Sequence, residues 1–460
     1  MEAVEIMESD TIVAIASPPG IGAVGIIRIS GKNATNVFGR IFRNKKQKWK
    51  SHKMYYGHIY SGTGEDDIHI DEVMACVMLA PRSYTSENVV EIYTHGGMTT
   101  VHGVLKASLN NGARLALPGE FTKRAFLSGR INLTQAEAVM DLISAKTDAA
   151  RRAGLKQLGG GISNKITKAR DSLLFWLANI ELSIDYPEHE EEAINRQTII
   201  EQGKIWLDEI INLYKTTSLG RVLREGIKTV IIGKPNVGKS TLLNAIIGED
   251  RAIVHEIPGT TRDVLSEQVR VGDVVLHLMD TAGLRNTIDP IEEIGINKAY
   301  EAASDAELIL LVLDRSCQPE PNIFEIMKKY KDKQVIVLLN KCDLPQASGW
   351  SMNKNKVNHE ISANNQQGIN DLLEDIENRF AKGLISSDDT DIITNERHKT
   401  LLKKAIDAVN NVLDELGMGV EEDLVSIGLR EAYNALGEIL GLEVSDDIVD
   451  RIFSEFCVGK

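Results

Sequence analysis

The spacing of apolar residues changes three times along the 460-residue chain, and each change predicts a different kind of structure. In residues 11–120, short β-branched runs such as TIVAIAS, VGIIRIS and NVVEIYTH alternate with glycine and proline, and one helical stretch lies near residues 101–109. This texture is typical of a compact α+β domain. From residue 134 apolar residues recur at helical spacing, and Thr134 with Glu137 has the form of a capping box that begins a helix.

From residue 227 the pattern becomes one of apolar runs that alternate with helical stretches. The runs are IKTVIIG, VVLHLMD, ELILLVLD and QVIVLLN, which is typical of βαβ units around a parallel sheet. Beyond about residue 385 helical spacing returns. Because the helical segments before and after this block each carry an apolar stripe, they most simply pack on each other. The pattern therefore predicts an α/β block inserted into a helical domain.

Composition is that of a globular protein without a membrane span. Hydrophobic residues make up 43% and charged residues 26%, and no run approaches the ~18 apolar residues that a span needs. The first ten residues are acidic where a signal peptide would be basic, so we expect no export. The four cysteines lie far apart without a C-x-x-C pair, which indicates reduced thiols in a cytoplasmic protein: Cys76, Cys317, Cys342 and Cys457.

The formal charge of −14 argues against generic attraction to nucleic acid, so any such contact must be local. One stretch, RNKKQKWKSHK, places six basic residues around Trp49. It is either a plain solvated loop or a local contact that offers phosphate-binding charges and a stacking face.

GKPNVGKS, at residues 233–240, follows an apolar run and precedes a helical one, which is the context that the G-x-x-x-x-G-K-S phosphate loop requires. Its glycines let backbone N–H groups curl around phosphate oxygens, and the helix N-terminus adds its positive end. Lys239 can neutralise the β and γ oxygens, while the Ser240 hydroxyl can bind Mg²⁺.

Four further motifs follow in order, each at a predicted strand end or between strands. GTTRD places Thr261 to complete the Mg²⁺ shell, and DTAG places Asp280 near the metal. In NKCD, Asp343 can accept hydrogen bonds from the N1–H and amine of guanine, which selects GTP over ATP, and SAN can support the base. Together they predict a GTPase domain whose nucleotide contacts are Asn236, Val237, Gly238, Lys239, Ser240, Thr241, His255, Glu256, Ile257, Pro258, Gly259, Thr260, Thr261, Asp280, Thr281, Ala282, Gly283, Asn340, Lys341, Asp343, Ser362 and Ala363.

The group that positions the attacking water is harder to identify from the motifs, because Leu284 follows DTAG where Ras-type enzymes have glutamine. Glu292 can act through a second water or be an exposed acid at a helix start. For charge stabilisation, Arg262 and Arg285 are candidates, and the alternative is a cation held beside Asn236 and the loop HEIPGTT.

Taken together, several stretches resemble the MnmE (TrmE) family of tRNA-modification GTPases over essentially the whole chain. They are GKPNVGKS, GTTRD, DTAGLR, TIVAIASPPGIGAVGIIRISG, PGEFTKRAFLSGRINLTQAEAV and the terminal FCVGK. The resemblance implies a multidomain α/β protein. Its parts would be an α+β folate-binding and dimerisation domain (1–130), an all-helical domain in two halves (131–224 and 385–460) and an inserted Ras-like P-loop GTPase domain (225–384) with a parallel-rich sheet.

Site residues follow from the resemblance position by position. K⁺ would be held by Asn236, Thr260 and the backbones of His255 and Ile257, and Glu292 would orient the catalytic water. The folate pocket would use Arg28, Glu91, Arg130 and Lys460. Arg130 stands where lysine is common, which keeps the charge but changes the donor geometry, and Ile21 stands where a basic residue is common, which affects the contacts there.

The reaction implied is addition of an aminomethyl or carboxymethylaminomethyl group at C5 of the wobble uridine of certain tRNAs. A tetrahydrofolate such as the 5-formyl or methylene form supplies the one-carbon unit, an FAD-dependent partner (MnmG, GidA) joins a homodimer in a heterotetramer, and GTP hydrolysis drives conformational change. The rival interpretation is a regulatory GTPase that binds RNA without modifying it. The N-terminal domain and the tail separate the two, because a pure switch has no use for Arg28, Glu91 or FCVGK.

Cys457 lies three residues before Lys460, and its neighbours decide between several roles. Val458, Gly459 and Lys460 do not fit a prenylation signal, and no ligand cluster accompanies the thiol. Spacing alone favours a small buried side chain after a helix. The family resemblance instead makes Cys457 a candidate nucleophile toward uridine C6, or an aid to transfer.

Overall fold

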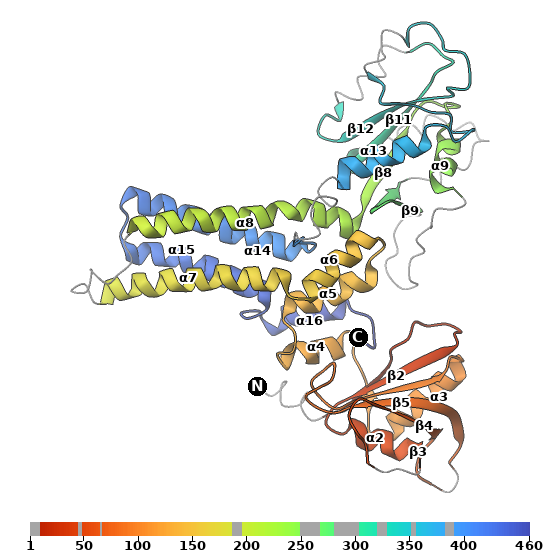
Figure 1. The fold of residues 1–460 in the computed structure, drawn as a ribbon, viewed down its shortest axis with the longest axis vertical. Coiled ribbons are helices and arrows are strands. Elements are labelled where there is room, and N and C mark those ends of the chain that lie inside the picture. Colours follow the sequence, from red (N-terminus) through yellow and green to blue (C-terminus); the bar gives the residue numbers. More distant parts are fainter. Residues whose placement is uncertain are drawn as a thin grey trace. The chain divides into compact units, whose positions relative to one another are not determined.

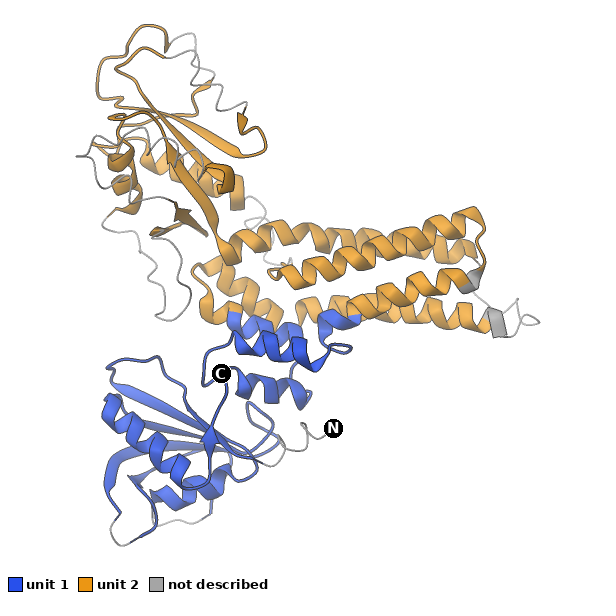
Figure 2. Cartoon of the chain, turned by 180° about the vertical axis from the view of Figure 1, so that it is seen from behind, with its two compact units in different colours: residues 1–140, 437–460 blue, residues 141–436 orange. Residues whose placement is uncertain are grey.

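The computed structural model describes residues 10–44, 48–64, 67–185, 196–248, 267–279, 303–319, 329–350, 356–381 and 391–460. Two compact units divide the chain (Figure 2). One comprises residues 1–140 and 437–460, and the other residues 141–436. The boundaries expected from the sequence at residues 130, 224 and 384 stay predictions.

A mixed seven-stranded sheet forms the centre of the first unit, in the order β3-β4-β5-β6-β2-β1-β7 (Figure 1). All neighbouring strands are antiparallel except β1 and β7. The strands are β1 (Ile12–Ile15), β2 (Val24–Ser30), β3 (Phe42–Arg43), β4 (Lys53–Tyr60), β5 (His69–Met78), β6 (Val89–His95) and β7 (Arg114–Leu115).

Side chains of this sheet alternate between a covered and an uncovered face, as the period of two predicts. Helices α2 (Ala34–Ile41) and α3 (Met98–Asn110) cover one face, and their apolar residues share a core with those of the strands. The other side, which we call the open face, carries Ile26, Arg28, Met54, Tyr56, Met74, Cys76, Glu91 and Tyr93. Its apolar members include the exposed side chains of Met54, Tyr56 and Met74.

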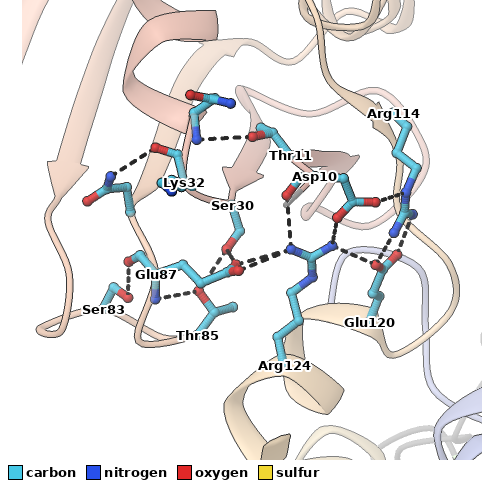
Figure 3. A network of polar contacts seen from close by, with 12 residues as sticks. Asp10, Thr11, Ser30, Lys32, Ser83, Thr85, Glu87, Arg114, Glu120 and Arg124 are labelled. Carbon is cyan, nitrogen blue, oxygen red and sulfur yellow. Dashed lines mark hydrogen bonds and ion pairs between the residues drawn. The ribbon is translucent and has the colours of Figure 1, made fainter. Parts of the chain in front are cut away.

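A buried polar network ties helix α4 (Glu120–Leu127) to the segments just before β1 and β6 (Figure 3). The Arg124 guanidinium donates to Glu120 at 2.9 Å and to Glu87 at 3.1 Å, and it also contacts Asp10. Although burial alone would raise the pKa of Glu120, hydrogen bonds from Arg114, a backbone N–H and Arg124 outweigh burial and lower that pKa. The network therefore keeps its charges paired inside the unit.

Helix α5 (Leu133–Ser144) begins two residues earlier than the sequence pattern indicated. The side chain of Asn132 accepts from the Gln135 N–H at 2.9 Å, and the Gln135 side chain accepts from the Asn132 N–H at 3.0 Å. The capping box is thus formed by Asn132 and Gln135, and its assignment to Thr134 and Glu137 was wrong. Both pairs have the required spacing, and the chain uses the pair that places Leu133 in the core.

The last helix, α16 (Asp446–Ser454), packs on α4 and the start of α5 although more than 300 residues separate them. Phe453 and Phe456 are buried there against Phe126, Ile131 and Leu133. The chain that follows α16 is therefore held at this unit.

A six-stranded sheet lies in the second unit in the order β13-β12-β11-β8-β10-β9, parallel except for the β9–β10 pair. Its strands are β8 (Ile227–Ile232), β9 (Glu267–Val271), β10 (Val274–Leu278), β11 (Leu308–Asp314), β12 (Gln334–Asn340) and β13 (His359–Glu360). β11 is apolar on both faces, as a central parallel strand must be. The helices described beside the sheet are α9 (Lys239–Ile247) and α13 (Ile369–Ala381).

Long helices from both sides of this α/β block pack on each other, which confirms the inserted arrangement (Figure 1). They are α7 (Gly161–Asp185), α8 (Arg196–Glu225), α14 (Glu396–Met418) and α15 (Glu422–Leu440), and the shorter α6 (Asp148–Leu158) precedes them. The predicted stripe of α14, including Leu402, Val409 and Leu416, is buried. Arg170 stacks on Tyr433 at 3.8 Å, which joins α7 to α15.

Trp49 does not provide the stacking face considered from the sequence. Its ring contacts Phe38, Phe42 and Tyr55 at centroid distances of 5.0, 5.9 and 5.1 Å, so it belongs to the core of the first unit. Among the described residues, no helix is both long and apolar enough to cross a membrane.

Candidate functional sites

The phosphate loop joins β8 to α9 in the second unit. Gly238 precedes the helix with φ of 98°, and a Cβ there would lie 2.3 Å from the Asn340 side-chain nitrogen. Gly238 is thus required both by its left-handed backbone and by the close approach of Asn340. Asn236 also has positive φ, at 61°. The loop holds the turned backbone that exposes N–H groups at a helix N-terminus.

Lys239, Ser240 and Thr241 form the first turn of α9, at its electropositive end. The Lys239 ammonium donates to the Lys234 carbonyl at 2.7 Å across the loop. Lys239 and Ser240 are partly buried and Thr241 is exposed. This turn can therefore offer a cation, a hydroxyl and backbone N–H groups to one anionic ligand.

Asn340 connects the phosphate loop to the two motifs expected to bind the base. Its side-chain nitrogen donates to the Val237 carbonyl at 2.8 Å, and its side-chain oxygen accepts from the Ala363 N–H at 3.0 Å. The Ser362 hydroxyl donates to the Asp343 carboxylate at 2.6 Å. The structure thus brings together the loop, NKCD and SAN, which lie at separate strand ends in the sequence.

Other residues expected at the nucleotide lie outside the described residues. They are His255, Glu256, Ile257, Pro258, Gly259, Thr260, Thr261, Asp280, Thr281, Ala282, Gly283 and Glu292. The alternatives Arg262 and Arg285 lie outside them as well.

A second constellation lies on the open face of the first unit, around the pair Arg28 and Glu91. These residues are cross-strand neighbours on β2 and β6, and two guanidinium nitrogens of Arg28 lie 2.9 Å from Glu91 Oε1. The Tyr93 hydroxyl donates to Glu91 Oε2 at 2.8 Å. Burial and this hydrogen bond raise the pKa of Tyr93. Glu91 is therefore fixed in place as an acceptor.

The C-terminal tail reaches the same place. Arg28 donates to the Gly459 carbonyl at 3.1 Å, although 431 positions separate the two residues. Gly459 has φ of 96°, and a Cβ there would lie 2.3 Å from the Ile15 carbonyl oxygen, so only glycine fits. Burial, and then the charge of Arg28, lower the pKa of the half-buried Lys460. Lys460 is thus a cation in a site that already holds one.

Arg130 joins this group through an aromatic ring. Its guanidinium lies 4.8 Å from the centre of Tyr84, and that of Arg28 lies 5.4 Å from the same ring. All four expected folate residues therefore gather on one side of the first unit. Sequence reasoning missed Tyr84 and Tyr93, and the alternation of β6, which puts Tyr93 on the same face as Glu91, could have indicated the latter.

The Cys457 thiol is exposed, so the expectation from spacing that it would be buried was wrong. Phe456 occupies the buried position instead, because the chain leaves α16 at Ser454. The Cys457 carbonyl accepts from the Gly119 and Lys460 N–H groups at 3.4 and 3.3 Å. All four cysteines are free thiols, as expected from their spacing.

Comparison with known proteins finds matches along nearly the whole chain, which includes the phosphate loop and the pair Arg28 and Glu91. Residues 133–457 match the family model described as the MnmE helical domain, and residues 11–130 match that of the GTP-binding protein TrmE N-terminus. The chain belongs to the MnmE family. It is 44% identical to the tRNA modification GTPase MnmE of Finegoldia magna over 98% of this chain and 100% of the relative. It is 45% identical to the MnmE protein of Clostridioides difficile over 98% and 99%, respectively.

Solved structures similar to a part of this MnmE-family chain include Era of Aquifex aeolicus and the FeoB G-domain of Methanococcus jannaschii. Era is 21% identical, covering 40% of this chain and 66% of its own, with a TM-score of 0.24. The FeoB domain is 22% identical, covering 34% and 97%, with a TM-score of 0.25.

Proposed function

We propose that this MnmE-family GTP hydrolase is a potassium-dependent enzyme of tRNA modification. With an FAD-dependent partner, MnmG (GidA), it adds an aminomethyl or carboxymethylaminomethyl group at C5 of the wobble uridine of certain tRNAs, using a tetrahydrofolate one-carbon unit. The observation that carries the proposal is the meeting of Arg28 and Glu91 with the distant tail, in a unit separate from the phosphate loop. A GTPase that acted only as a switch would have no use for that second site.

Nucleotide binding is proposed for the loop 236–241, for Asn340, Lys341 and Asp343, and for Ser362 and Ala363. The bonds from Asn340 to Val237 and Ala363 support a single connected site. In guanine, N1–H and the exocyclic amine both donate, and a carboxylate accepts both. Asp343, already oriented by Ser362, is therefore the proposed guanine reader.

Mg²⁺ and K⁺ are proposed ligands of the same end of the site. The Ser240 hydroxyl lies in the first turn of α9, and oxygen donors are those that Mg²⁺ prefers. The left-handed backbone of Asn236 sits in the phosphate loop, which fits a side-chain oxygen held for K⁺ beside the phosphates. We also propose Thr261 as a ligand of Mg²⁺, and His255, Ile257 and Thr260 as ligands of K⁺. Glu292 is proposed to orient the attacking water. K⁺ would supply positive charge to the transition state.

The folate site is proposed at Arg28, Glu91, Arg130 and Lys460, with Tyr84 and Tyr93 as further members. A reduced folate combines a flat ring that offers donors with anionic carboxylates. Glu91 can accept from the ring, and the basic side chains can bind anions. Cys457, exposed two residues before Gly459, is the proposed nucleophile or aid to transfer.

A homodimer is proposed through the open face. Met54, Tyr56 and Met74 are adjacent across β4 and β5, and each is between 45% and 58% exposed. Apolar side chains grouped in this way favour a protein partner. A second copy placed there would also border the folate site, since Tyr93 pairs with Met74. The dimer would join MnmG in a heterotetramer, and the free cysteines fit a reduced cytoplasmic environment.

The decisive experiment compares tRNA nucleosides by mass spectrometry in cells with and without the protein. Loss of the C5-modified wobble uridine on deletion, restored by the wild-type chain, is expected. Cells that carry Arg28→Ala should also lack the modification, whereas those with Arg43→Ala, a half-exposed arginine on β3, should keep it. An unchanged wobble uridine after deletion would contradict the proposed reaction.

Three further tests separate the parts of the proposal. GTP turnover should be markedly faster in K⁺ than in Na⁺, and Asn236→Ala should remove that difference; equal rates in both salts for the wild type would refute the potassium site. Light scattering should show that Tyr56→Glu is monomeric while Met98→Glu, on helix α3, remains a dimer. If Cys457→Ser keeps full tRNA modification, the thiol is structural.

A further inference from the structure

Two consecutive residues, Asp314 at the end of β11 and Arg315 directly after it, contact the turn 340–343. Asp314 Oδ2 lies 2.7 Å from the Lys341 ammonium, and Arg315 Nη1 donates to the Cys342 carbonyl at 2.6 Å. The Arg315 N–H also donates to the Asn340 carbonyl at 2.9 Å. Three successive residues of the turn are therefore anchored to one dipeptide.

The Asp314 carboxylate is well placed to act as an anchor. Its other oxygen accepts from the Ser316 N–H at 2.8 Å and from the Ser316 hydroxyl at 2.6 Å. Its side chain is 10% exposed, against 31% for Lys341. Burial alone would raise the pKa of Asp314, but the bonds from Lys341 and Ser316 outweigh burial and lower it, so the carboxylate is charged at neutral pH.

The backbone of the turn needs such an anchor. Lys341 has φ of 64°, in the left-handed region that costs a residue with a side chain about 1 kcal/mol or more. That conformation turns the chain so that Asp343 meets Ser362 and Asn340 meets Val237. Charge-assisted hydrogen bonds from the turn to a buried carboxylate can offset the strain.

We propose that Asp314 and Arg315 are positioning residues that set the guanine specificity of the turn 340–343. Neither is part of the motifs expected to touch the nucleotide. Asp314 fixes Lys341, Arg315 fixes the carbonyl of Cys342 directly before Asp343, and together they aim the Asp343 carboxylate. The inference rests on the proposed role of Asp343 as the guanine reader.

Guanine specificity depends on the orientation of the Asp343 carboxylate, because its hydrogen bonds to N1–H and to the exocyclic amine must form at the same time. A turn that shifts by a few tenths of an ångström weakens the bond to the exocyclic amine and that to N1–H together. Asn340 bonds the phosphate loop at Val237, but the loop and the first turn of α9 also have contacts of their own, through Gly238 and Lys239. Loss of the anchor should therefore weaken base recognition and leave hydrolysis at saturating nucleotide intact.

The test uses the full-length chain and measures Kd for GDP together with kcat and KM for GTP and ITP, because inosine lacks the exocyclic amine. Asp314→Ala and Arg315→Ala should each raise Kd and KM about tenfold, narrow the preference for GTP over ITP, and change kcat less than twofold. Asp314→Glu, which retains the charge, should recover part of the affinity. Asp407→Ala is the matched control, since Asp407 also pairs with a lysine at 2.7 Å but on exposed α14.

Xanthine nucleotides distinguish failure of this inference from failure of the guanine site. Asp343→Asn should transfer preference from GTP to XTP, because xanthine has a carbonyl where guanine has its amine. If it does so while Asp314→Ala and Arg315→Ala bind GDP as the wild type does, the positioning role is overturned. A fall in kcat as large as the rise in KM would overturn it too, since the residues would then support the whole fold. If Asp343→Asn does not change the preference, the proposed guanine site itself fails.

Discussion

Replacing Glu91 by glutamine tests whether the ion pair with Arg28 organises the open face. The pair is close to buried, with side-chain exposures of 14% for Arg28 and 19% for Glu91, and Tyr93 adds a third bond to the same carboxylate. Glutamine keeps the size of the side chain and one acceptor oxygen but removes the charge. Arg28 would then be left as a largely desolvated cation.

The magnitude lies below the 3 to 5 kcal/mol typical of breaking a fully buried pair, because glutamine retains one hydrogen bond and some solvent reaches both groups. We expect about 2 kcal/mol, which is about thirtyfold in the local opening equilibrium of β2 and β6. Hydrogen exchange of peptides that cover residues 24–30 and 89–95, measured in the intact chain, reports this equilibrium directly.

Glu72→Gln provides the control, since Glu72 is an exposed glutamate on β5 of the same sheet. It removes the same charge from a solvated position, so exchange in β2 and β6 should change less than twofold. If Glu91→Gln and Glu72→Gln change hydrogen exchange in β2 and β6 equally, the Arg28–Glu91 pair contributes no more than a surface charge. The argument from its burial is then refuted.

Three other changes test separate elements. Asn132→Ala should destabilise α5 by about 1 kcal/mol, seen as faster exchange of its first turn, and unchanged exchange would mean that Asn132 is not the cap. Gly238→Ala should lower GDP affinity at least tenfold, because a Cβ would meet the side chain of Asn340, and wild-type affinity would contradict that contact. Glu120 has a lowered pKa, so its contribution to stability is complete above its ordinary pKa of 4.5 and is lost as pH falls through the lowered pKa. Glu120→Gln should therefore flatten the acid dependence of the melting temperature. A pH profile of melting that does not change would exclude Glu120 as the source of that dependence.

Local patterns predicted the parts of this protein whose physics is local. The phosphate loop needs a strand, a glycine-rich turn and a helix in direct succession, and all three lie within residues 227–247. The inserted position of the α/β block followed from apolar stripes that had no other means of burial. The Thr134 box failed for an equally local reason, because Asn132 and Gln135 satisfy the same spacing two residues earlier.

Contacts between distant segments could not be read from periodicity. Arg28 and Gly459 meet because α16 packs on α4, and no local signal in either segment specifies the other. The same holds for Tyr84, which a loop places under Arg130. Asp314 and Arg315 ended an apolar run and carried no motif, and only the parallel pairing of β11 with β12 put them behind the turn 340–343.

Lys460, in the C-terminal tail, lies where its charged form is disfavoured. Burial and the neighbouring charge of Arg28 both disfavour its ammonium, so the folded unit holds this proton less tightly than an unfolded chain would. Stability of the first unit therefore rises as pH increases through the lowered pKa of Lys460, the opposite of a lysine that gains an acidic partner. An anion bound beside Arg28 and Lys460 would reverse both effects, because it would compensate the two charges together. Within the fold the charge of Glu91 favours the ammonium without outweighing burial and Arg28, so an anionic ligand at the tail would stabilise Lys460 further, as the proposed folate site requires.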